Sequence, residues 1–133
     1  MIENEIGRII ISELKADHSA FILELVNSSG WKEFIGERNV HSIEDSKIYI
    51  INILANDNIK YHVVSIKSEN IPIGIVTFIK RDYLDHHDIG FAFLPEYSGH
   101  GYAFEASKHL LDIYKLTHPI ILATTKTSNK KSI

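Results

Sequence analysis

Apolar residues recur with two different spacings along the chain, and these spacings predict strands and helices. Short runs rich in Ile and Val, separated by turn-forming residues, predict strands. The expected strands cover residues 7–14, 61–67, 71–80, 86–94 and 119–124. Apolar residues three and four positions apart predict helices that begin after Asp17, at Ser42 and near Gly99. The predicted order is therefore β-α-α-β-β-β-α-β.

Capping residues support the first two helices. Asp17 stands where an N-cap belongs, and Gly30 is expected to end that helix, ahead of an irregular stretch that contains Trp31. Residues 42–55 open with Ser42, a capping residue, and then two acids that suit the positive end of a helix dipole.

The connections between the strands predict the sheet. Polar turns over residues 68–70 and 81–85 are short enough for antiparallel hairpins, so the three middle strands should form a meander. The last strand follows a long helix over residues 99–115, which makes a crossover unit with a parallel strand pair. The expected fold class is α/β, with a mixed sheet in a single domain over residues 1–133.

The helix over residues 99–115 has the clearest amphipathic pattern. Its expected apolar face consists of Tyr102, Ala106, Leu110, Ile113 and Tyr114. Its expected water-facing residues are Glu105, Lys108, His109 and Asp112.

Composition removes several classes of function. The net charge is −3 over 133 residues, so no basic surface favours a nucleic-acid partner. The chain has no cysteine, which excludes disulfides and thiolate chemistry and fits a cytoplasmic protein. No apolar run approaches about 18 residues, and the acidic N-terminus does not resemble a signal peptide, so we expect no membrane association. His86 and His87 lack the helical spacing of a common zinc pair, and no metal is predicted.

Two glycines stand where a strand gives way to a helix, in the stretch LPEYSGHGYAFEA over residues 94–106. The first N–H groups of a helix attract anions, and glycine allows a phosphate to come close. An ATP-type loop would need Lys and then Ser or Thr after Gly101, where Tyr102 and Ala103 stand. A dinucleotide site would need a third glycine. Taken alone, the pair of glycines fits a phosphate site and a simple helix-initiating turn equally well.

The residues around the glycines resemble the Gcn5-related N-acetyltransferases, and within them the RimJ/RimL-type branch that acetylates the N-terminal amines of ribosomal proteins. The matching residues are Pro95, Glu96, Gly99, Gly101, Tyr102, Ala103, Glu105 and Ala106. Residues 73–75, 88–91 and 129–132 match further motifs of that family. Two positions depart from it: Ser98 replaces a usual tryptophan, and Glu96 stands where the wider family has Gln or Arg.

This resemblance implies an acetyl-CoA-dependent N-acetyltransferase in which a neutral amine attacks the thioester directly. The amine would belong to a protein N-terminus or a small molecule, and a homodimer is compatible with the resemblance. The cofactor would lie between the fourth and fifth strands, with its pantetheine arm against Phe93 and Leu94 and a backbone amide there polarising the thioester carbonyl. Its pyrophosphate would bind the turn and helix start, formed by Gly99, His100, Gly101, Tyr102, Ala103 and Phe104, and Asn129 is a further cofactor-binding candidate.

Asp88 is the acid that the resemblance makes the candidate general base, acting directly or through water. The alternative interpretation is a strand-end acid that faces solvent beside His86 and His87. Glu105 is expected to form a pair or a cap in the helix and not to catalyse.

The resemblance stops with residues 129–133, where members of the family continue with a helix and two more strands. Those elements often carry a tyrosine that protonates the leaving thiolate. The expectation is therefore an incomplete acetyltransferase domain whose turnover is open. The alternative function is a catalytically silent module that binds acyl-CoA or dimerises.

Overall fold

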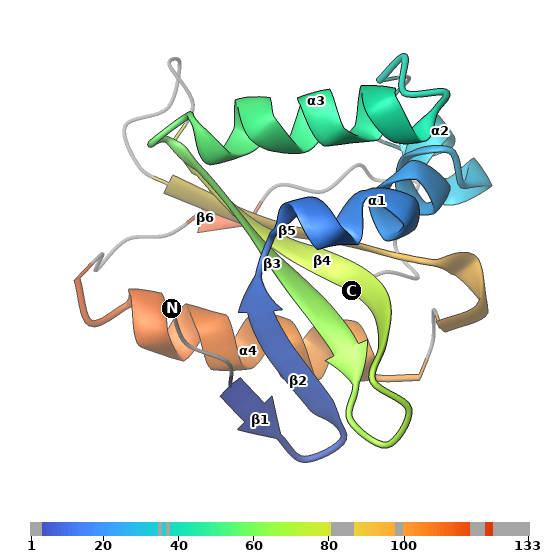
Figure 1. The fold of residues 1–133 in the computed structure, drawn as a ribbon. Helices are drawn as coiled ribbons and strands as arrows, with labels where there is room; N and C mark the ends of the chain where they lie inside the picture. Colours follow the sequence, from blue (N-terminus) through green and yellow to red (C-terminus); the bar gives the residue numbers. More distant parts are fainter. Residues whose placement is uncertain are drawn as a thin grey trace.

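Six strands of the described chain form one mixed sheet, and they lie in the sheet in their order along the sequence (Figure 1). The computed structural model describes residues 4–34, 36, 38–80, 87–97, 100–117 and 122–123. The strands are β1 (Asn4–Ile6), β2 (Ile9–Glu13), β3 (Ile59–Ile66), β4 (Ile71–Lys80), β5 (His87–Phe93) and β6 (Leu122–Ala123). The first five pair antiparallel, and β6 pairs parallel to β5. The predicted meander and the parallel crossover pair are both confirmed.

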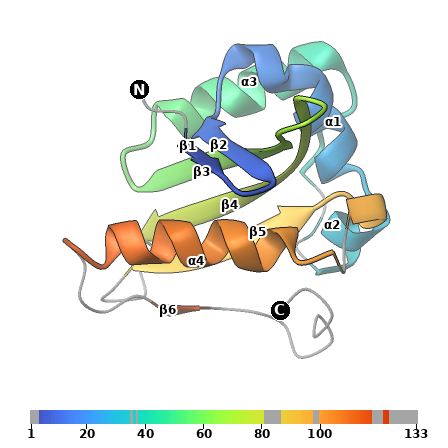
Figure 2. The same ribbon diagram turned by 90° about the horizontal axis from the view of Figure 1, so that it is seen from below.

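Helices cover both faces of this sheet. The α-helices are α1 (Ser19–Val26), α2 (Ser29–Phe34), α3 (Ile43–Leu54) and α4 (Tyr102–Tyr114), and short 3-10 helices are η1 (Ala16–His18) and η2 (Pro95–Tyr97). Helices α1 and α3 cross one face, and α4 crosses the other (Figures 1 and 2). Each face has its own hydrophobic cluster, one around Ile22, Leu25 and Ile50 and the other around Ile9, Ile11 and Leu110.

The first predicted strand is wrong in one respect, because residues 7–14 do not form one continuous strand. Gly7 has a φ of 52°, in the left-handed region that favours glycine, and with Arg8 it forms the turn between β1 and β2. Ile6 and Ile9 are paired across this turn. Arg8 is thereby placed at the tip of an N-terminal hairpin.

The region between β2 and α3 also differs from the prediction. Asp17 is not the N-cap of a helix but lies within η1, and His18 precedes α1. Helix α1 ends at Val26, whereas Gly30 and the buried Trp31 belong to a separate helix, α2. The reason is that Ser28 both ends α1 and begins α2: its Oγ donates to the Leu25 carbonyl at the end of α1 and accepts from the Trp31 N–H at the start of α2.

Helix α3 begins as predicted. Ser42 is its N-cap and accepts a hydrogen bond from the Asp45 N–H at 3.1 Å. Asp45 in turn accepts from the His41 N–H, so two N–H groups at this helix end are satisfied. Ser46, fully buried, donates to the Ser19 carbonyl at 2.7 Å and ties α3 to α1.

The predicted amphipathic pattern of α4 is confirmed at its centre and wrong at its flanks. Ala106 and Leu110 are buried against the sheet, but Ile113 is 41% exposed. Glu105 and His109 are half-buried and do not face open water. The structure explains Glu105, because this flank of α4 meets Arg8 of the N-terminal hairpin. None of the described helices is both long and apolar enough to cross a membrane.

Candidate cofactor site

The candidate site begins where β5 passes through η2 to the start of α4. The described pairing of β6 with β5 lies at the beginning of β5, where Asp88 pairs with Leu122 and Ile89 with Ala123. Phe93 at the other end of β5 pairs with Gly74 of β4. The end of β5 and the start of α4 are the two elements from which a phosphate-bearing ligand could be held.

Gly101 determines how α4 starts. It is the N-cap of the helix and has φ 85° and ψ −2°, a left-handed conformation that side chains strongly disfavour. A Cβ atom at this position would also lie 3.3 Å from Nη2 of Arg8. Glycine is therefore required here by backbone conformation and by a close neighbour.

The first N–H groups of α4 have no acceptor within the helix. The first intrahelical bond runs from the Glu105 N–H to the Gly101 carbonyl at 3.0 Å, and the N-cap glycine supplies no capping side chain. The N–H groups of Tyr102, Ala103 and Phe104 precede that bond. Such groups, with the positive end of the helix dipole behind them, are suited to bind an anion.

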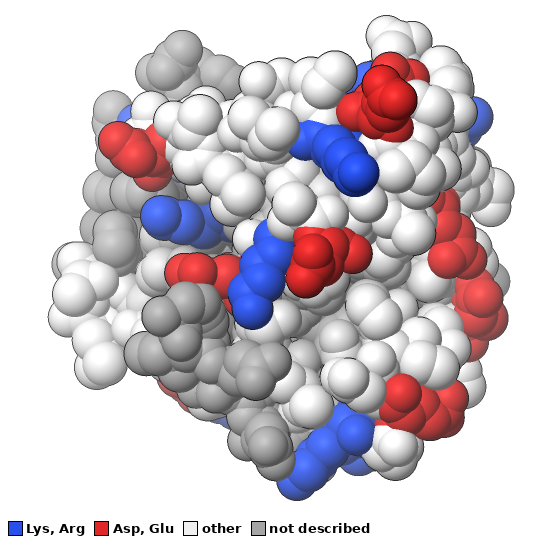
Figure 3. Space-filling view, in the orientation of Figure 1, with Lys and Arg blue, Asp and Glu red and all other residues white. Residues whose placement is uncertain are grey.

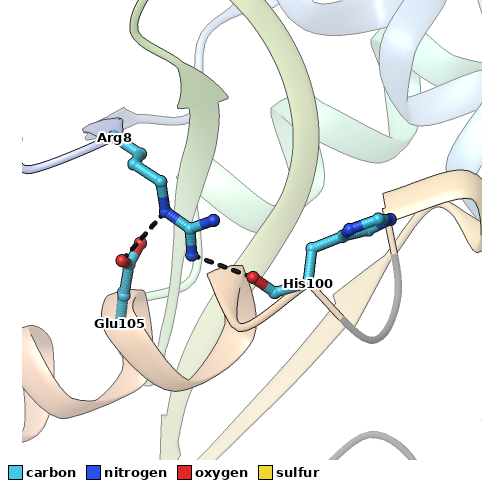
Figure 4. A network of polar contacts seen from close by, with 3 residues as sticks. All are labelled: Arg8, His100 and Glu105. Carbon is cyan, nitrogen blue, oxygen red and sulfur yellow. Dashed lines mark hydrogen bonds and ion pairs between the residues drawn. The ribbon is translucent and has the colours of Figure 1, made fainter.

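Arg8 joins the N-terminal hairpin to this helix start (Figure 4). Its Nη2 donates to the His100 carbonyl at 2.9 Å, and its Nε donates to Glu105 Oε1 at 3.1 Å. The guanidinium also lies over the Tyr102 ring, 4.4 Å from the ring centroid. The prediction that Glu105 forms a pair is thus confirmed, but sequence reasoning missed its partner.

The end of β5 presents one amide away from the rest of the sheet. The Leu94 N–H donates to the Ile73 carbonyl of β4 at 2.9 Å, so that amide is already used. Because neighbouring residues of an antiparallel strand direct their N–H groups to opposite sides, the Phe93 N–H points away from β4. The Phe93 ring covers Gly74, where a Cβ atom would collide with it.

Asp88 is buried at the start of β5. It is only 2% exposed and pairs with Ile79 of β4 as well as with Leu122. The interpretation as a solvent-facing acid is therefore wrong. Ile89 and Phe91 pack on the α4 side of the sheet, so strand alternation directs Asp88 to the face covered by α1 and α3.

Several predicted residues lie outside the described part of the chain. These are His86, Ser98, Gly99 and Asn129. Among the residues that are described, no group of three or more His, Asp or Glu side chains could hold a metal ion. On the face shown in Figure 3, the described Lys and Arg side chains are interspersed with Asp and Glu.

A second polar pair lies at the far end of α4. His62 Nε2 of β3 is 2.6 Å from the Tyr114 hydroxyl, and the Tyr114 ring stacks on Phe78 with 3.7 Å between centroids. Burial lowers the pKa of His62 below its usual value, and burial raises the pKa of Tyr114. This pair anchors the C-terminal end of the helix, away from the glycine turn.

Comparison with known proteins gives the family. Residues 8–133 match the family model described as the acetyltransferase (GNAT) domain. YnaD of Bacillus subtilis strain 168, named as an uncharacterized N-acetyltransferase, is 31% identical over 105 residues, which is 79% of this chain and 61% of YnaD. The chain therefore spans less than two thirds of that relative.

Solved structures share the fold at lower sequence identity. The ribosomal-protein-S5-alanine acetyltransferase from Vibrio fischeri superposes with a TM-score of 0.78 at 20% identity, covering 99% of this chain and 78% of that one. A spermidine N-acetyltransferase from Vibrio cholerae, solved with CoA and spermine, has a TM-score of 0.76 at 19% identity and covers 93% of this chain and 75% of that one. With the family match over residues 8–133, the chain belongs to the GNAT acetyltransferase family.

Proposed function

We propose that this protein binds acetyl-CoA at the start of α4 and transfers the acetyl group to a primary amine. The observation that carries the proposal is the left-handed Gly101, which opens the helix that follows β5 and η2 with no capping side chain, in a chain of the GNAT family. The V. cholerae neighbour that holds CoA and spermine supports CoA as the ligand class and an amine as the acceptor. The acceptor would be a protein N-terminus or a small amine. A cytoplasmic location, a single domain and a homodimer stay predictions.

The residues at the turn fit a diphosphate group. The N–H groups of Tyr102, Ala103 and Phe104 have no acceptor in the helix, and Gly101 adds no side chain beside them. In the proposal, these three N–H groups hold the pyrophosphate of CoA together with the backbone of Gly99, His100 and Gly101. The exposed Phe104 side chain, 67% accessible, takes part only through its backbone.

The end of β5 would hold the reacting part of the cofactor. Bound acetyl-CoA supplies a thioester whose carbonyl carbon is open to attack by an amine. The Phe93 N–H, which points away from β4, would donate to the thioester oxygen as negative charge develops on it. Leu94 would only pack, since its N–H is bonded to Ile73. Of the two neighbouring amides, only that of Phe93 is therefore proposed to polarise the thioester carbonyl.

Asp88 is the proposed proton acceptor. Asp88 lies five residues before Phe93 on β5, roughly 16 Å away along an extended strand, so its carboxylate would take the ammonium proton through bound water and leave a neutral nitrogen that can attack the carbonyl carbon. The new C–N bond forms and the C–S bond breaks; the nitrogen gives up its second proton to solvent, and the sulfur leaves as a thiolate that takes up a proton from solvent. The burial of Asp88, which is 2% exposed, supports a specific role for this carboxylate.

Calorimetry and turnover together test the proposal. The wild-type protein should bind CoA, and it should release free thiol when acetyl-CoA is mixed with a panel of polyamines and peptides with free N-termini. Asp88→Asn keeps the side-chain volume and should lower kcat by about 10²- to 10⁴-fold while leaving CoA affinity unchanged. Thermal melting of the variant would show that it is folded.

The outcomes separate the alternatives. CoA binding with no turnover on any amine would favour a catalytically silent acyl-CoA-binding module. Absence of CoA binding by the wild-type protein would contradict the proposal as a whole. Unchanged kcat in Asp88→Asn would leave acetyl transfer standing and reject Asp88 as the base.

A further inference from the structure

We infer that Arg8, at the tip of the β1–β2 hairpin, is a positioning residue of the cofactor site. This inference rests on the proposed binding of CoA at the start of α4. Arg8 is separated from His100 by 92 positions in sequence and from Glu105 by 97, yet one guanidinium contacts both. The hairpin thereby becomes part of the structure that holds the glycine turn.

The contact with His100 orients the peptide that precedes Gly101. A trans peptide is planar, and its C=O and N–H point in opposite directions. With the His100 carbonyl held by Arg8 Nη2 at 2.9 Å, the Gly101 N–H must point away from Arg8. Arg8 therefore fixes the direction of one of the amides proposed to bind the pyrophosphate. It does so in a backbone conformation, φ 85°, from which glycine could readily depart.

The split geometry of the guanidinium supports this role. Arg and a carboxylate frequently pair through two parallel hydrogen bonds. Here Nε bonds to Glu105 while Nη2 bonds to the His100 carbonyl, and among the described residues the buried Glu105 Oε2 has no hydrogen-bond partner. Arg8 is thus engaged with the turn at the expense of a second bond to the carboxylate. The ion pair with Glu105 holds the Arg8 side chain in place, and Nη2 of the same guanidinium holds the turn at His100.

Charge acts in the same direction. Arg8 places a full positive charge beside the positive end of the α4 dipole, above the Tyr102 ring. Glu105, in the first turn of α4, offsets part of this charge through its ion pair with Arg8 Nε. An anionic diphosphate at the helix start would relieve the remaining repulsion. Glu96, in contrast, cannot supply positive charge at this turn.

Binding measurements with two phosphate ligands test the inference. Arg8→Gln should weaken the affinity for CoA and for 3′-phospho-ADP, which carries the diphosphate without the pantetheine arm, by about tenfold each. Arg8→Lys keeps the charge but cannot donate to both acceptors in a fixed fork, so it should recover only part of the loss. Lys108→Gln is the matched control, because Lys108 also pairs with an acid on α4, Asp112 at 3.3 Å, but away from the turn.

Steady-state kinetics separate a defect in diphosphate binding from a general loss of protein stability, because the latter would not raise the KM for acetyl-CoA alone. In Arg8→Gln the KM for acetyl-CoA should rise by about tenfold while kcat and the KM for acetyl-pantetheine stay within about twofold. Equal affinities of the wild type and Arg8→Gln for 3′-phospho-ADP would overturn the inference and leave the proposed function intact. A similar loss in Lys108→Gln, or full recovery in Arg8→Lys, would also overturn the positioning role. A wild-type protein that binds neither ligand would overturn both proposals.

Discussion

The two ends of α4 are tied to the rest of the molecule by different chemistry, the C-terminal end to β3 and β4 and the N-terminal end to the β1–β2 turn. At the C-terminal end, Tyr114 stacks on Phe78 and bonds to His62, and these three side chains are buried or half-buried. At the N-terminal end, Arg8 makes polar contacts with His100 and Glu105 at the surface, and its side chain is half exposed. One end is held by packing and the other by a charged side chain that does not bond to the first N–H groups of the helix.

This difference separates stability from ligand binding along one helix. A packed aromatic pair contributes mainly to the free energy of unfolding, since removing it leaves a cavity. A half-exposed ion pair contributes little to that free energy. Its consequence lies in the conformation that it maintains at Gly101. Changes at the two ends should therefore have separable effects.

Phe78→Ala should have the largest effect. Phe78 is 3% exposed and its ring stacks on Tyr114, so its removal should cost about 3 to 4 kcal/mol of unfolding free energy. Urea denaturation measures this cost. The folded fraction should still bind CoA with unchanged affinity. A selective loss of CoA affinity would break the comparison, because it would couple the packed end to the turn.

Gly101→Val should have the opposite profile. A β-branched residue at φ 85° is strained and would lie against Arg8, so the turn should change shape and CoA affinity should fall by roughly 50-fold. Gly36→Val is the matched control, since Gly36 also has a positive φ, 120°, but lies outside α4 and the turn. Calorimetry with both variants should show weakened binding only for Gly101→Val, and equal weakening would argue against a local effect.

Tyr114→Phe tests the polar part of the packed end. The change removes the hydroxyl that lies 2.6 Å from His62 Nε2 but keeps the ring on Phe78. We expect a loss of about 1 kcal/mol in unfolding free energy, much smaller than that of Phe78→Ala. A loss as large as the one from removing Phe78 would mean that the hydrogen bond, and not the stacking, anchors this end.

The smallest expected effect is a pH dependence of stability. Burial lowers the pKa of His62; the charge of Lys60 lowers it further, and the charge of Glu13 acts in the opposite direction. Burial and the charge of Lys15 also lower the pKa of His18. As the pH falls below about 6.5, the unfolded chain takes up protons more readily than the folded protein. The unfolding free energy should therefore decrease as the pH falls from about 6.5 through the lowered pKa values of the folded protein. His62→Gln should flatten part of this slope in urea titrations, and an unchanged slope would assign the dependence to His18 alone.

Much of the fold was predictable because its periodic segments are long. The strand over residues 71–80 and the helix capped by Ser42 lie where the pattern predicts them. The N-terminal hairpin was not predictable, because the two-residue turn at Gly7 and Arg8 interrupts a run of β-branched residues without Pro or Asn to indicate it. The helix boundary near Ser28 was missed for a similar reason, since one hydroxyl makes both contacts that end α1 and begin α2.

The candidate site was predictable only in its local part. The Gly-x-Gly turn indicated the helix start at Gly101, because a strand, a glycine turn and a helix are consecutive in sequence. Arg8 could not be found in this way, since its contacts span more than 90 positions and depend on how the hairpin packs beside α4. The burial of Asp88 likewise follows from its two neighbouring strands and not from its local sequence.

The most direct test of the central claim follows the backbone amides of α4 during a titration with CoA. In ¹H–¹⁵N NMR spectra of the wild-type protein, the signals of Tyr102, Ala103 and Phe104 should shift most strongly, as expected for N–H groups that donate to phosphate oxygens. The amide of Tyr114 at the far end should shift little. Saturable binding of CoA that leaves these three amides unmoved would contradict the account.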